Sequence, residues 1–117
     1  MPKHETIEFD LSSLPSRIQV DFENVSAELT LQYSELSQTF TVDYEDLDDD
    51  THKIMGEPLT YGVPLWYWAS YDWLPVERLV PMDESGLESS VTKGNLQKTV
   101  FVMDQDSVYE SGDGNGS

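Results

Sequence analysis

The stretch Ser26-Ala-Glu-Leu-Thr-Leu-Gln-Tyr33 decides the fold class, because its apolar side chains fall on every second position. Those side chains are Ala27, Leu29, Leu31 and Tyr33, with polar residues between them. A period of two is typical of a β-strand that turns one face to a core and the other to water. The stretch therefore predicts a half-buried strand.

The same alternation recurs on both sides of this stretch. Residues 7–9, 17–22 and 39–44 each alternate apolar positions with polar or threonine-rich ones. The short polar breaks between these runs favour hairpins or a meander over βαβ units. Antiparallel sheets tolerate one apolar and one solvated face. We therefore expect an all-β chain, folded as a small antiparallel β-sandwich or β-barrel.

The second half of the chain is rich in turn-forming residues. Between positions 56 and 81 it carries Gly56, Pro58, Gly62, Pro64, Pro75 and Pro81. Proline removes a donor from the strand ladder and is confined to edges, strand starts and turns. We therefore expect only short strands here, at residues 54–55, 65–70 and 78–80.

The end of the chain divides into a strand and a tail. Residues 98–103 predict a last strand, and a single helical turn is possible only at 11–14 or 83–89. Residues 105–117 end in a glycine-rich run and lack apolar periodicity. We expect one β domain over residues 1–104 and a flexible, acidic, glycine-rich tail over 105–117.

The charge balance of the chain excludes several functions. The 117 residues include 23 Asp and Glu against six Lys and Arg, for a formal net charge of −17. Nucleic-acid binding needs clustered cations facing phosphates, and no two of the six cations are adjacent. The same charge repels anionic membranes. It favours solubility and electrostatically steered binding to basic partners.

Other composition features narrow the class further. The chain has no cysteine, which excludes disulfides and thiolate metal sites. The start of the sequence lacks the apolar run of a signal peptide. No stretch approaches the roughly 20 apolar residues of a membrane helix. We expect neither secretion nor membrane insertion.

Two groups of residues were weighed for metal binding or catalysis. Asp46, Asp48, Asp50 and Glu57 fall at positions one, three, five and twelve of a calcium-loop pattern, but Thr51 stands where that loop needs glycine. A solvated acidic loop over residues 45–50 is the favoured interpretation. The two histidines, His4 and His52, lie in no nucleophile motif, and nothing predicts a cofactor. We expect no enzyme.

All three tryptophans fall within residues 61–73. As a strand, this stretch would place Trp66 and Trp68 on one face and Leu65, Tyr67 and Ala69 on the other. Core packing, a sugar-stacking surface and a protein interface are the open interpretations. Tryptophan and tyrosine are enriched as interface anchors, so core plus protein interface is favoured over sugar binding.

Three blocks in the second half of the chain carry a resemblance to a known protein family. They are Gly56-Glu-Pro-Leu-Thr-Tyr-Gly62-Val-Pro-Leu65-Trp66, then residues 74–86, and then residues 91–100. These blocks resemble the baseplate plug proteins of contractile phage tails, a family best described in a cyanophage. The upstream strands are similar in pattern only, so the resemblance covers roughly residues 25–103.

The resemblance implies a structural protein of the virion, made in the host cytoplasm and built into the tail baseplate. It would plug or line the junction of central hub and tail tube through contacts with hub and tube proteins, in several copies around the tail axis. The motif positions that would carry the fold and these contacts are Gly56, Pro58, Tyr61, Gly62, Pro64, Leu65, Trp66, Trp68, Leu74, Pro75, Leu79, Pro81, Asp83, Glu84 and Asn95. The carboxylates would keep a DNA channel negative, so that DNA passes without adhering.

Two other functions stay open at the level of sequence. A free-standing carbohydrate-binding module would use Trp66, Trp68 and Trp73 as stacking platforms. An acidic mimic of DNA would need Asp21, Glu28 and Asp43 in a row at roughly phosphate spacing on one sheet face.

Overall fold

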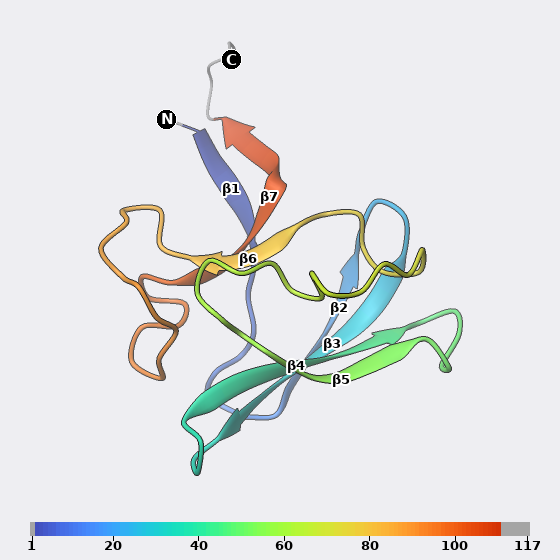
Figure 1. The fold of residues 1–117 in the computed structure, drawn as a ribbon, viewed down its shortest axis with the longest axis horizontal. Helices are drawn as coiled ribbons and strands as arrows, with labels where there is room; N and C mark the ends of the chain where they lie inside the picture. Colours follow the sequence, from blue (N-terminus) through green and yellow to red (C-terminus); the bar gives the residue numbers. More distant parts are fainter. Residues whose placement is uncertain (1, 111–117) are drawn as a thin grey trace.

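The structure is a computed structural model that describes the backbone of residues 2–110 and the side chains of residues 6–104. Within those residues every regular element is a β-strand, and the strands are joined by turns and loops (Figure 1). The described strands are β1 (Pro2–Ile7), β2 (Ser16–Asp21), β3 (Ser26–Ser34), β4 (Thr39–Asp46), β5 (Lys53–Pro58), β6 (Leu79–Met82) and β7 (Phe101–Glu110).

The strands form two antiparallel sheets. The first half of the chain makes a continuous meander of four strands in the order β2-β3-β4-β5, as expected from the short polar breaks. The second sheet has the order β1-β7-β6, so the two ends of the chain pair with each other (Figure 1). The all-β prediction with antiparallel sheets is confirmed.

One hydrophobic core joins both sheets. The alternation in the opening stretch is realised directly, because Ala27, Leu29 and Leu31 are all buried on one face of β3. They belong to the same apolar cluster as Leu79 of β6 and Val102 of β7. Burying a side chain of this size contributes about 1.5–3 kcal/mol. The core therefore depends on residues far apart in sequence, as a two-sheet arrangement requires.

The strand predictions of the second half need correction in two places. Residues 65–68 form a turn and residues 69–70 are irregular, so this stretch contains no strand. The last strand spans residues 101–110 and not 98–103, so 105–110 belong to a strand and not to a tail. Its pairing partner is β1, from the opposite end of the chain, and local sequence carries no signal for such a partner. The rest of the expected tail, residues 111–117, lies outside the described residues.

The two stretches in which a helical turn was possible contain no helix. Residues 11–14 and 83–89 contain turns and bends, without a helix. Within the part of the chain that the structure describes, no helix is long and apolar enough to cross a membrane.

A β-bulge interrupts the pairing of β4 with β5, between Val42 and Tyr44. Asp43 lies at this break, and its carboxylate accepts hydrogen bonds from the amide of Gly56 at 2.7 Å and from the side chain of Gln32 at 2.6 Å. Gly56 has a φ of 77°, a left-handed value that favours glycine. The side chain of Asp43 thus replaces the ladder bond that the bulge removes.

Replacing Asp43 with alanine should lower the free energy of unfolding by about 1–2 kcal/mol, because two donors lose their acceptor. Asp50, an exposed aspartate in the next turn, is the matched control. Its alanine variant should stay within about 0.5 kcal/mol of the parent. Urea unfolding followed by tryptophan fluorescence measures both, and equal midpoints for the two variants would contradict this role of Asp43.

Candidate functional site

A buried carboxylate organises the aromatic segment that follows β5. Glu57 is only 6% exposed. One of its oxygens accepts the backbone amide of Trp66 at 2.8 Å, and the other accepts the indole N–H of Trp68 at 2.8 Å. Hydrogen bonds to a charged acceptor are stronger than those between neutral groups. Glu57 therefore fixes two tryptophans with one side chain.

This clamp separates the two tryptophans that a strand would have placed together. Trp66 has a left-handed φ of 58°, which turns the chain at that point. Its side chain is 5% exposed, whereas that of Trp68 is 56% exposed. The expectation that Trp66 and Trp68 share one face is therefore wrong, because the turn at Trp66 breaks the period of two.

Trp66 and Tyr44 form the centre of the core beneath this segment. Their rings pack edge to face with centroids 5.1 Å apart. The hydroxyl of Tyr44 donates to the backbone oxygen of Trp73 at 2.6 Å. Burial, with a smaller contribution from the Asp46 carboxylate, raises the pKa of Tyr44. The hydroxyl therefore stays protonated and holds the far end of the aromatic segment to the sheet.

A stack of three rings continues outward from this point. Trp73 lies between Tyr71 and His52, at centroid distances of 4.8 Å on both sides and interplanar angles of 12° and 6°. The imidazole nitrogens of His52 are each 3.4 Å from a carboxylate, that of Asp46 and that of Asp49. Tyr71 ends the stack on the solvent side, where it is 53% exposed. The stack joins the aromatic segment to the β4–β5 hairpin.

The other end of the segment is fastened to the β2–β3 turn. The side chain of Asn24 donates to the backbone oxygen of Leu74 at 2.9 Å and accepts the amide of Val76 at 3.1 Å. The amide of Glu23 donates to the carboxylate of Glu77 at 2.8 Å. Figure 1 shows the chain between β5 and β6 running past the four-stranded sheet to that turn. Residues 66–77 thus form a strap, fixed by Glu57 at one end and Asn24 at the other.

The motif residues before the strap serve the fold of the second sheet. The amides of Gly62 and Leu65 donate to the oxygens of Pro81 and Leu79, each at 2.8 Å. These bonds cover the free edge of β6, which its sheet partner β7 leaves open. Gly62 has a φ of 75°, so a side chain at this turn would strain the backbone.

Two further motif residues hold loops by their side chains. Asp83 accepts the amide and the hydroxyl of Ser85 at 2.9 and 2.8 Å, and these bonds hold the pKa of Asp83 below its usual value. The amide of Asp83 in turn donates to the hydroxyl of Tyr61 at 3.1 Å. Asn95 accepts the amide of Thr92 at 2.8 Å and closes the loop that precedes β7.

The fifteen motif positions therefore divide by exposure. Seven are buried: Leu65, Trp66, Leu74, Leu79, Pro81, Asp83 and Asn95. Three are half-buried: Tyr61, Pro64 and Pro75. Five are exposed: Gly56, Pro58, Gly62, Trp68 and Glu84. Most of the pattern thus specifies the fold, and only its exposed members can contact another molecule without rearrangement.

The residues of the calcium-loop pattern do not converge on one point. Glu57 is engaged by the two tryptophans, while Asp46 accepts the amide of Asp48 at 2.8 Å and contacts His52. Within the described residues no group of three or more His, Cys, Asp or Glu side chains could hold a metal ion. His4, the second histidine, has a side chain outside the described set.

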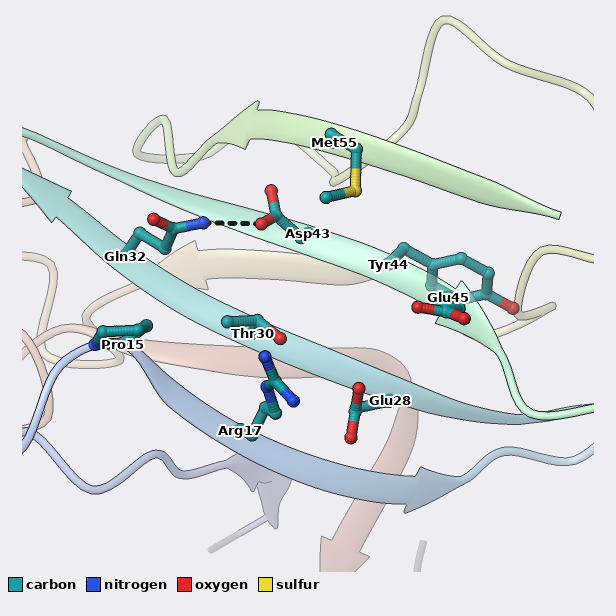
Figure 2. Close-up of a pocket in the computed structure, with 9 residues that line it drawn as sticks. All are labelled: Pro15, Arg17, Glu28, Thr30, Gln32, Asp43, Tyr44, Glu45 and Met55. Atoms are coloured by element: carbon teal, nitrogen blue, oxygen red, sulfur yellow. Dashed lines mark hydrogen bonds between the residues drawn. The ribbon is translucent and has the colours of Figure 1, made fainter. Parts of the chain in front are cut away.

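The outer face of the four-stranded sheet holds a groove of about 290 Å³. Figure 2 shows Arg17, Glu28 and Asp43 along it, with the hydrogen bond from Gln32 to Asp43. Glu28 stands directly opposite Glu45 in the register, so two like charges face each other. Of the three acids that a DNA mimic would align, Glu28 and Asp43 line the groove, but Asp43 is already hydrogen-bonded and Asp21 lies outside it.

The structural roles of Glu57, Asp43 and Asn24 were missed by the sequence analysis. From the sequence, Glu57 was singled out only as a calcium ligand, Asp43 only as an outward acid and Asn24 only as part of a polar break between strands. A usable signal for Glu57 existed, because it is the one charged residue of the motif over residues 56–66. A lone carboxylate at such a place favours an interaction with backbone or indole donors.

The comparisons with known proteins gave one finding. The chain matches, over residues 4–107, the family described as "Cyanophage baseplate Pam3 plug gp18". A search of curated proteins and a search of solved structures each returned no match.

The carboxylate clamp predicts a specific stability loss. Replacing Glu57 with glutamine keeps the shape of the side chain, but its –NH2 group donates and cannot accept a hydrogen bond, so one of the two tryptophan donors loses its partner. The free energy of unfolding should fall by about 1–3 kcal/mol. Chemical denaturation followed by near-ultraviolet circular dichroism measures this loss.

Glu23 provides the matched control, since it is exposed and its own side chain makes none of the hydrogen bonds described above. The Glu23→Gln variant removes the same charge and should stay within about 0.5 kcal/mol of the parent. If both variants unfold at the same denaturant concentration, the clamp does not stabilise the fold.

Proposed function

This chain belongs to the cyanophage baseplate plug family, and we propose that it plugs or lines the junction between the central hub and the tail tube. The family places the chain in the virion, as a structural protein of the tail baseplate. It is a structural family and not an enzyme family, and it implies contacts with other baseplate components. The family match over residues 4–107 is the observation that carries the proposal.

The geometry of the strap supports a role in assembly by protein–protein contact. A plug has to keep its shape under load, and the strap is fixed at Glu57, at Tyr44 and at Asn24. Exposed aromatic side chains on the strap supply contact area of the kind that protein interfaces use. We propose that the exposed motif residues face neighbouring subunits, and that several copies stand around the tail axis.

The net charge of −17 supports a position next to the DNA path. A surface rich in carboxylates repels phosphate, so DNA can pass without adhering. In the proposed arrangement part of the acidic surface lines the channel and part binds basic neighbours. A carbohydrate-binding role is less well supported, because Trp66 is buried and the half-buried ring of Trp73 is already stacked against Tyr71 and His52.

Mixing the chain with the tail hub protein of the same phage tests the proposal. Size-exclusion chromatography with light scattering should show a complex whose mass exceeds that of either protein alone. The chain by itself and the hub by itself are the reference runs. A chain that elutes unchanged in the presence of the hub would contradict a position at the hub junction.

A further inference from the structure

The strap carries three large aromatic side chains that the fold leaves in water. Tyr67 is 69% exposed, Trp68 is 56% exposed and Tyr71 is 53% exposed. They lie within five consecutive residues of one loop. Exposed aromatic side chains that gather on one part of a surface mark interaction sites more often than scattered ones do. We call these three residues the aromatic platform.

Two of the three rings are held in place before any partner arrives. The indole N–H of Trp68 donates to Glu57. The ring faces of Trp68 are therefore available to a partner, but its N–H donor is not. Tyr71 is stacked on Trp73, and Trp73 is stacked on His52. A ring that is already fixed loses little conformational entropy on binding. The platform therefore has the preorganisation that interface anchors show.

The neighbouring sheet edge does not offer a simpler mode of binding. β5 is the edge strand beside the platform, and strand addition would need its free backbone groups. That edge begins at Lys53, contains the left-handed Gly56 and ends at Pro58, next to the bulge at Asp43. Lysine, proline and bulges are the devices that block strand pairing at sheet edges. Binding at this side of the molecule is therefore expected through side chains.

Charge selects the chemistry of the partner. Asp72 is exposed in the platform loop, and Asp49 lies 3.4 Å from His52 at the inner end of the ring stack. A second copy of this chain would carry another net charge of −17, which repels the first copy. A basic segment meets opposite charges there instead, and guanidinium groups also stack favourably on tyrosine and tryptophan rings.

We infer that the aromatic platform docks an arginine-bearing segment of another baseplate protein, with the guanidinium groups against Tyr71 and Trp68 and their charge opposite Asp72. The inference rests on the proposed function for the identity of the protein that carries this segment. It assigns the contact to one face of the chain, and it sets this face apart from any contact between copies.

Affinity measurements with the tail hub protein as the probe test the inference. The parent chain is immobilised and compared with Tyr67→Ser/Tyr71→Ser, which removes two platform rings that hold no buried donor. The control is Leu36→Ser/Leu87→Ser, which removes two exposed apolar side chains from other loops. The platform variant should raise Kd at least about tenfold and the control less than about twofold. Unchanged melting temperatures establish that both variants are folded.

The contribution of charge to binding is tested separately, by salt and by variants of Asp72. Raising the salt from about 50 to about 300 mM should weaken the parent's binding, because the screening length falls. Asp72→Lys should weaken binding more than Asp72→Asn does, since it adds repulsion to the lost attraction. Binding that is insensitive to salt and to both Asp72 variants would overturn the basic partner.

The remaining outcomes separate the inference from the proposed function. Tight hub binding that survives the platform double variant overturns the inference and leaves the proposed function standing. No hub binding by the parent chain overturns both. If the parent forms a dimer that the platform variant dissociates, the occupant is a second copy. If glycans quench the fluorescence of the parent but not of the Trp68→Ala variant, the occupant is a sugar.

Discussion

The two hydrogen bonds accepted by the carboxylate of Glu57 are the interactions on which the strap depends. The carboxylate lies in the interior and accepts one backbone donor and one indole donor from the same turn of the strap. Without these acceptors both N–H groups would lose their partners, at a cost of about 1–3 kcal/mol for the amide of the buried Trp66. The clamp therefore fixes one end of a segment that contains no strand.

This constraint also explains how the aromatic residues are divided between the core and the surface. The left-handed turn at Trp66 directs that ring onto Tyr44, where it completes the core. Two residues later Trp68 is held by the same carboxylate on the solvent side. One buried acid thus holds one tryptophan in the core and the next one at the surface.

The sequence was informative where period and pairing are local. The alternation around Leu29 and Leu31 predicted the meander and its buried face, and the Gly/Pro blocks led to the correct family. The sequence was uninformative where a segment depends on residues that lie far from it in the chain. The strand 101–110 depends on β1 at the other end of the chain, and the turn at Trp66 depends on an acid nine residues earlier. The alternation over residues 65–70 is compatible with a strand as well as with the observed turn. Only the tertiary contact with Glu57 decides between the strand and the turn.

Hydrogen exchange of the two clamped donors tests the central claim most directly. In the uniformly ¹⁵N-labelled parent chain, the amide of Trp66 and the indole N–H of Trp68 should both exchange more slowly than those of an unprotected peptide. At least one of the two should exchange faster in the Glu57→Gln variant, in which a single side-chain acceptor remains. An indole N–H of Trp68 that exchanges at the unprotected rate in the parent would show that Glu57 does not hold it, and would contradict the account.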